Sequence, residues 1–175
     1  MPKRRVGPID GYGASRNGEE MKIVVMSVGR VRQPFVLQGE AEYLQRIRGS
    51  FQVELVELGM ESPESMSPTE VQNREAEEIL KRSKGYEYLV VLDERGKTLS
   101  SKQFSDFVQT RMNSGVKSVC LIIGGAYGVS EKIRQEADSI LSLSTLTFPH
   151  QLARLVLVEQ LYRAHTLQKG VSYHK

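Results

Sequence analysis

Short apolar blocks of strand length alternate with longer blocks of helical spacing from Met21 to the C-terminus. The block Ile23–Val28 predicts a first strand. A helix is predicted over Phe35–Arg48, entered after Pro34 and left at Gly49. Apolar residues at alternate positions then predict a second strand, carried by Phe51, Val53, Leu55 and Leu58.

Local capping signals predict the next two helices. Ser67 and Glu70 have the spacing of a capping box, in which hydroxyl and carboxylate satisfy free backbone N–H groups, and the helix continues to Ser83. A third strand is predicted over Tyr86–Asp93, followed by a loop over Glu94–Leu99. Another helix then begins at Ser100 or Ser101 and runs to Asn113.

The last third of the chain places two strands before a long helix. Val119–Ile123 is continuously apolar, as a strand buried on both faces requires, and Ile140–Phe148 predicts a further strand and loop. Pro149 suits the first turn of the helix predicted over His150–Lys169. This alternation predicts an α/β fold, a mostly parallel sheet with helices on both faces, in a single domain over residues 21–175.

The glycines Gly124 and Gly125 end the buried strand and indicate a ligand site. Ligands of open α/β sheets bind at the carboxyl ends of strands, and glycine lets backbone amides approach them closely. A plain strand-to-helix turn capped by Ser130 would explain the same glycines. The spacing does not fit a dinucleotide G-x-G-x-x-G motif, and Gly96-Lys97-Thr98 has Val91 where a P-loop requires its first glycine.

Composition narrows the class of protein. Of the 175 residues 39% are hydrophobic and 26% charged, and no stretch approaches the ~18 apolar residues of a membrane span. Cys120 is the single cysteine, which excludes an internal disulfide and favours a cytoplasmic protein. Its apolar neighbours indicate a small buried residue in preference to a nucleophile. One cysteine and three scattered histidines form no recognisable ligand set, so no metal is predicted.

The charge distribution is more informative than the net charge of +3. From Arg154 to Lys175 four basic residues face one acid, whereas Glu57–Glu78 holds seven acids and one arginine. A phosphate-facing surface near the C-terminus and two ordinary solvated faces explain this equally well. Residues 1–20 are basic at the start, rich in glycine and poor in apolar residues, which predicts a disordered leader.

Four segments together resemble one known family: LIIGGAYG from Leu121, LSTLTFPHQLAR from Leu143, VEQLYRAH from Val158 and YHK from Tyr173. They resemble the ribosomal RNA large subunit methyltransferase H family of the SPOUT superfamily. The resemblance extends from Met21 to the last residue. The resemblance implies a homodimer with an α/β knot near the C-terminus. It also implies use of S-adenosylmethionine to methylate N3 of a pseudouridine in large-subunit (23S) ribosomal RNA on the assembled ribosome. Because that family begins at the position of Met21, translation is expected to start there, or residues 1–20 are a dispensable tail.

The resemblance also implies cofactor contacts, to which we add Gly125 because of its position. Backbone groups would read the adenine edge, while leucine and phenylalanine side chains would exclude water. Leu92 would lie beside the glycines if the two strands pair in parallel, although a core leucine needs no ligand. The predicted cofactor residues are Leu92, Gly124, Gly125, Leu143, Ser144, Thr145, Leu146, Thr147 and Phe148.

Catalysis of this kind depends mainly on positioning, together with loss of the N3 proton. We predict Arg154 as the electrostatic or phosphate-binding group, His174 as a base or base-positioning residue, and Tyr173 as a residue that stacks on the target base. His150 shares a helix face with Arg154, or else caps its helix. Alternatives are a ribosome-associated protein that binds the cofactor without transferring methyl groups, and a nucleotide-dependent oxidoreductase, which the absent fingerprint disfavours.

The last predicted helix has apolar residues around its whole circumference, so it must be covered on more than one side. We expect the sheet to cover one side and the same helix of a second subunit to cover the other.

Overall fold

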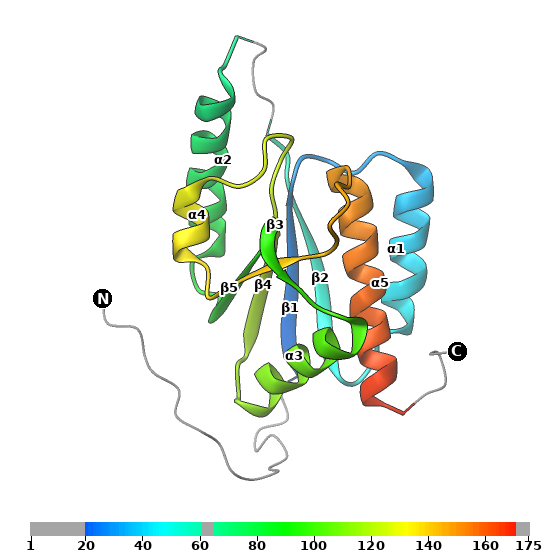
Figure 1. The fold of residues 1–175 in the computed structure, drawn as a ribbon. Coiled ribbons are helices and arrows are strands. Elements are labelled where there is room, and N and C mark those ends of the chain that lie inside the picture. Colours follow the sequence, from blue (N-terminus) through cyan, green and yellow to red (C-terminus); the bar gives the residue numbers. More distant parts are fainter. Residues whose placement is uncertain (1–19, 61–64, 171–175) are drawn as a thin grey trace.

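The computed structural model describes residues 20–60 and 65–170, which form one five-stranded sheet flanked by five helices (Figure 1). The strand order is β2-β1-β4-β3-β5, and every pairing in the sheet is parallel. The elements are β1 (Met21–Val28), α1 (Pro34–Arg46), β2 (Phe51–Leu58), α2 (Pro68–Ser83), β3 (Tyr88–Thr98), α3 (Ser101–Asn113), β4 (Ser118–Ile123), α4 (Glu131–Glu136), β5 (Ser139–Ser142) and α5 (His150–Gln168).

Helices cover both faces of the sheet, and successive residues of the central strands supply the two cores. Figure 1 shows α1, α3 and α5 on one face of the sheet and α2 and α4 on the other. Ile23 and Val25 of β1 belong to the core on the first face, whereas Val24 and Met26 belong to the core on the second. Because β1 and β4 are buried on both faces, both carry continuous apolar runs, Ile23 to Met26 in β1 and Val119 to Ile123 in β4. The predicted parallel α/β fold is confirmed.

The helix ends follow the local signals. Ser67 accepts a hydrogen bond from the Glu70 amide while the Glu70 carboxylate accepts one from the Ser67 amide, which is the predicted capping box. Ser100 and Gln103 form a second capping box at the start of α3. Gly49 follows α1 with a φ of 71°, a conformation that a side chain would disfavour.

One prediction about the strands was wrong. The segment 94–99, expected to be a loop, continues β3 to Thr98. Within the strand and loop predicted over 140–148, the strand ends at Ser142. The pairing of β3 with β5 shifts register between Leu92 and Lys97, and both of these residues pair with Leu141. Residues 93–96 therefore form a bulge that is not paired with β5. The bulge divides β3 into two parts.

Several predictions lie outside the described residues, namely the leader over residues 1–19 and the roles of Tyr173 and His174. The knot stays a prediction. No helix in the ranges 20–60 and 65–170 is long and apolar enough to cross a membrane. In the same ranges no group of three or more His, Cys, Asp or Glu side chains is arranged to hold a metal ion.

Candidate active site

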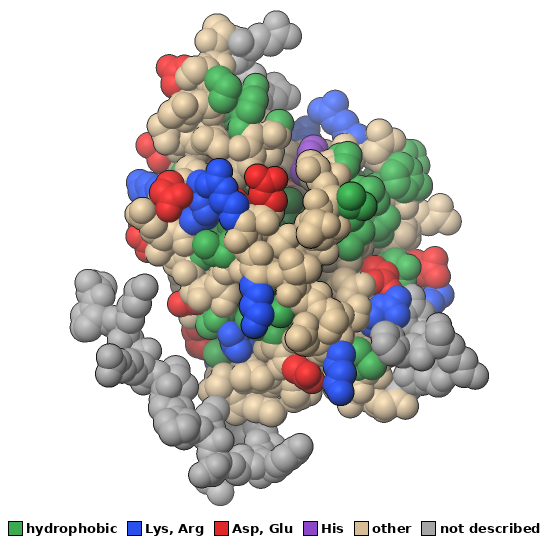
Figure 2. All heavy atoms as spheres, viewed as in Figure 1, with side chains coloured by type: hydrophobic (Ala, Val, Ile, Leu, Met, Phe, Trp, Pro, Cys, Tyr) green, Lys and Arg blue, Asp and Glu red, His purple; other side chains and the backbone are tan. Residues whose placement is uncertain are grey.

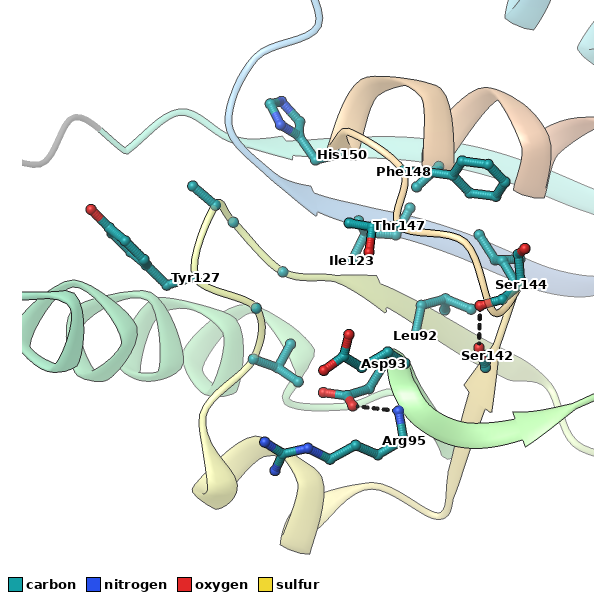
Figure 3. A pocket seen from close by; sticks show the side chains of 18 of the residues that line it. Leu92, Asp93, Arg95, Ile123, Tyr127, Ser142, Ser144, Thr147, Phe148 and His150 are labelled. Atoms are coloured by element: carbon teal, nitrogen blue, oxygen red, sulfur yellow. Dashed lines mark hydrogen bonds between the residues drawn. The ribbon is translucent and has the colours of Figure 1, made fainter.

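A cleft of about 420 Å³ opens at the carboxyl ends of β3, β4 and β5 (Figure 3). Three segments form most of its walls: the bulge of β3, the glycine loop after β4, and the loop between β5 and α5. The parallel pairing of Leu92 with Ile123 places the ends of β3 and β4 side by side. The cleft therefore lies where ligands of open α/β sheets bind.

Eight of the nine predicted cofactor residues line this cleft. Thr145 is the exception: it is exposed and does not contribute to the walls. The eight that meet are Leu92, Gly124, Gly125, Leu143, Ser144, Leu146, Thr147 and Phe148. Segments some fifty residues apart in sequence thus form one surface because β3 lies between β4 and β5.

Serine side chains shape the loop after β5. The Ser142 hydroxyl donates to the Ser144 carbonyl over 2.9 Å, and the Leu146 amide donates to the Ser144 hydroxyl over 2.9 Å (Figure 3). These local bonds replace the strand ladder, which explains why β5 ends at Ser142 although the following residues alternate in hydrophobicity. Leu146 is 71% exposed at the rim of the cleft.

A charged pair forms another part of the wall. Arg134 of α4 donates from Nη1 to Asp93 Oδ2 over 2.9 Å and to the Val129 carbonyl over 2.7 Å. Asp93 also accepts a hydrogen bond from the Arg95 amide over 2.9 Å, within the bulge of β3 (Figure 3). Burial by itself would lower the pKa of Arg134, but hydrogen bonds with Glu131 and Asp93 raise it. The Arg134 guanidinium therefore stays charged, and its hydrogen bond to Asp93 joins the bulge to α4.

The glycine loop turns back on itself. The Gly128 amide donates to the Gly125 carbonyl over 3.0 Å, and Gly128 has a φ of 72°. A Cβ on Gly124 would lie 2.9 Å from the Gly128 carbonyl carbon and from Val129 Cγ1. Gly124 is therefore required by the close return of its own loop, before any ligand is considered.

Arg154, which was predicted as the electrostatic or phosphate-binding group, is not among the residues that line the cleft. Its side chain is 2% exposed, and its guanidinium donates to both Glu40 oxygens, from Nε over 2.6 Å and from Nη2 over 2.8 Å. Nη1 donates to Glu57 Oε1 over 2.8 Å and to Ser27 Oγ over 3.3 Å. All three guanidinium nitrogens therefore donate to side chains of α1, β1 and β2. Arg154 consequently has no access to a phosphate or a nucleobase in this arrangement.

His150 lies at the edge of the cleft, in the first turn of α5 (Figure 3). Its ring packs against the loop after β1, where a Cβ on Gly29 would lie 3.2 Å from Nε2. Nε2 is buried without a hydrogen-bond partner among the residues that the structure describes. The N-cap residue of the helix is Pro149, and no side chain caps the helix with a hydrogen bond.

Sequence reasoning did not find Asp93 and Arg134. Asp93 carries a usable signal, since it is an acidic residue at the carboxyl end of a predicted buried strand. Arg134 carries none, because its partner is 41 residues away in sequence and the two meet only through the register of the sheet.

Comparisons with known proteins agree with this geometry. A family model described as "Predicted SPOUT methyltransferase" matches residues 21–174. The chain is 40% identical to ribosomal RNA large subunit methyltransferase H of Desulfitobacterium hafniense, over 89% of this chain and 99% of that one. It is 39% identical to the protein of that name from Streptococcus uberis, over 89% and 100%. A solved structure described as a probable methyltransferase from Bordetella pertussis Tohama I has a similar fold. Its TM-score is 0.51 at 12% identity, over 83% of this chain and 96% of that one.

Proposed function

The chain belongs to the SPOUT methyltransferases, and among them to the ribosomal RNA large subunit methyltransferase H family, and we propose that it methylates N3 of a pseudouridine in large-subunit (23S) ribosomal RNA. The proposed methyl donor is S-adenosylmethionine, and the proposed substrate is the assembled ribosome. The observation that carries the proposal is the meeting of eight predicted cofactor residues in one cleft at the carboxyl ends of the strands.

The cleft fits the proposed cofactor in size and in chemistry. Its volume of about 420 Å³ lies in the usual range of small-molecule sites, ~300–1,000 Å³. Leu92, Leu143 and Phe148 supply apolar wall for an adenine ring, and the loop 142–148 supplies backbone groups for its polar edge. When bound, S-adenosylmethionine supplies a methyl group already activated by a positive sulfur.

The remaining chemistry falls to residues that orient the nucleobase and accept the N3 proton. We leave the electrostatic role predicted for Arg154 out of this proposal, because Glu40 and Glu57 already bind its guanidinium. We keep Tyr173 as the residue proposed to stack on the target base and His174 as the proposed base or base-positioning residue. Among the residues that line the cleft, Tyr127 is 52% exposed and Leu146 is 71% exposed, and such side chains can pack against a base that is splayed out of its stack.

The proposed functional unit is a homodimer, as membership of the family first suggested. Phe35 and Leu37 at the start of α1 are 61% and 47% exposed, and α1 packs beside α5. Apolar side chains gather on this side of the molecule (Figure 2). Leu152, Val156 and Tyr162 of α5 are also only partly buried within one chain. Sedimentation should show a dimer that dissociates on dilution or not at all, and a monomer at every concentration would contradict it.

The direct test is transfer of labelled methyl from S-adenosylmethionine to ribosomes that lack the modification, with isolated ribosomal RNA in parallel. The proposal expects transfer to ribosomes and little to free RNA. Binding of S-adenosylmethionine, measured by calorimetry against NAD and ATP as controls, tests the cofactor separately. A protein that binds the cofactor but transfers methyl to neither substrate would be a binding protein instead of this enzyme.

A further inference from the structure

Helix α2 contacts the glycine loop through two polar side chains on one face. Gln72 and Glu75 are three residues apart, so both point toward the same neighbour. The Gln72 side-chain amide donates to the Tyr127 carbonyl over 2.6 Å. The Gly125 amide donates a hydrogen bond to the Glu75 carboxylate. Helix α2 therefore holds the Gly125–Gly128 turn at two points, the Gly125 amide and the Tyr127 carbonyl.

The Glu75 carboxylate lies directly behind Gly125. A Cβ on Gly125 would overlap the carboxylate and would come within 2.9 Å of Glu75 Cδ. Ala76 and Ile79 pack α2 on the sheet and fix the backbone of Glu75, so a Cβ on Gly125 could be accommodated only if the Glu75 carboxylate gave up its present position and its bond to the loop. Helix α2 thus explains why residue 125 is a glycine, whether or not a cofactor is bound.

The position of Glu75 is unfavourable for a carboxylate. The residue is 7% exposed, and burial raises the pKa of Glu75, while the hydrogen bond from Gly125 lowers it in part. A buried acid costs stability unless its bonds repay the loss of water. On the opposite side of α2, Glu77 is exposed and makes no comparable contact with the loop. The burial of Glu75 is therefore tied to its contact with the loop.

The turn held in this way is also a wall of the cleft, which residues 124–129 line together with Gln72. The Tyr127 side chain projects from this turn, away from Leu92 and Ile123 in the cleft (Figure 3). We propose that Gln72 and Glu75 are positioning residues, which hold the Gly125–Gly128 turn in the conformation that the cofactor requires. The inference rests on the proposed function, because it assigns a role within the S-adenosylmethionine site.

The first experiment compares S-adenosylmethionine affinity among single variants by calorimetry, with melting temperatures measured alongside. Glu75→Ala removes the acceptor and should weaken binding by about tenfold or more, and Gln72→Ala by several-fold, as expected for loss of one positioning hydrogen bond. Glu75→Gln keeps an acceptor of the same length and should recover most of the affinity. Glu77→Ala, on the exposed side of the same helix, is the matched control and should bind like the wild type.

A second experiment separates packing against α2 from approach of the cofactor. Gly125→Ala should weaken binding strongly when Glu75 is present and only slightly in a Glu75→Ala background, because the overlapping carboxylate is then gone. Such non-additivity is expected for residues in contact. If glycine is needed there because the cofactor approaches residue 125, the loss will be equal in both backgrounds, and the role of α2 is overturned.

A third measurement does not depend on the cofactor. In the free protein, the Gly125 amide proton resonance should shift with pH as Glu75 titrates, and Glu75→Gln should abolish that shift. The inference would be overturned if the pH dependence of the Gly125 resonance were the same in the wild type and in Glu75→Gln. It would also be overturned if folded Glu75→Ala bound S-adenosylmethionine with wild-type affinity. If the wild type does not bind S-adenosylmethionine, the proposed function fails and the positioning role fails with it, while the resonance still reports whether the contact exists.

Discussion

Replacing Arg154 with alanine should destabilise the fold instead of acting on the chemistry. The side chain joins α5 to α1, β1 and β2 through Glu40, Ser27 and Glu57. Burial by itself would lower the pKa of Arg154, but its bonds with Glu40 and Glu57 raise it, so the guanidinium is charged at any working pH. Removal of this cation leaves two carboxylates facing an empty space.

The size of the effect follows from the burial of each partner. Breaking a buried ion pair by deleting one member costs about 3–5 kcal/mol, mainly because the remaining charge is uncompensated. The side chain of Glu40 is 3% exposed and would bear this cost, whereas that of Glu57 is 33% exposed and keeps water. Since a domain is stable by about 5–15 kcal/mol, Arg154→Ala should lose a large part of its stability.

Urea unfolding of the wild type, Arg154→Ala and the double variant Arg154→Met with Glu40→Leu measures this directly. The double variant removes both buried charges and should recover most of the stability, because apolar replacements of buried pairs are often neutral or stabilising. It should also retain methyl transfer below its melting temperature. A loss of less than about 1 kcal/mol in Arg154→Ala with transfer abolished would refute the structural role and return Arg154 to the chemistry.

Three further outcomes are expected. Gly96→Ala should lower the free energy of unfolding by about 1–3 kcal/mol, because the added Cβ would lie 2.5 Å from the Leu141 carbonyl carbon. It should also weaken cofactor binding, since Leu141 belongs to the strand that leads into the cofactor loop. An unchanged melting temperature and affinity would contradict this. Cys120 should react with a thiol reagent only as fast as the protein opens, since burial raises the pKa of its thiol to about 12, and fast reaction of the folded protein would be inconsistent with that. Burial, with a contribution from Lys169, lowers the pKa of His165 from 6.5, so the unfolded chain binds more protons and stability should fall as pH drops below about 6.5. His165→Asn should reduce that fall, as urea unfolding at several pH values would show.

Features set by local chemistry were predictable from the sequence. The capping residues Ser67 and Ser100 act within their own helices, so the starts of α2 and α3 agree with the prediction. The extension of β3 was not predictable, because Glu94–Thr98 has weak strand propensity and pairs only through the register that Gly96 permits against β5. Likewise, the serine bonds that end β5 depend on the path of the loop.

The candidate site was predictable where it depends on strand order and not where it depends on distant side chains. Once β3 and β4 pair in parallel, Leu92 and Gly124 must approach the same edge of the sheet. The contacts of Arg154 were not predictable, because its spacing from His150 indicates a shared helix face but not what covers that face. Its main partner, Glu40, is 114 residues away in sequence, and no local pattern connects the two.

The measurement that tests the central claim most directly is the identity of the methylated nucleoside. Ribosomes that lack the modification would be treated with the protein and labelled S-adenosylmethionine, and the ribosomal RNA digested for nucleoside mass spectrometry. The account predicts that the label appears in a pseudouridine methylated at N3 of the base. Label on a ribose oxygen, on another base, or on no nucleoside despite demonstrated cofactor binding would contradict it.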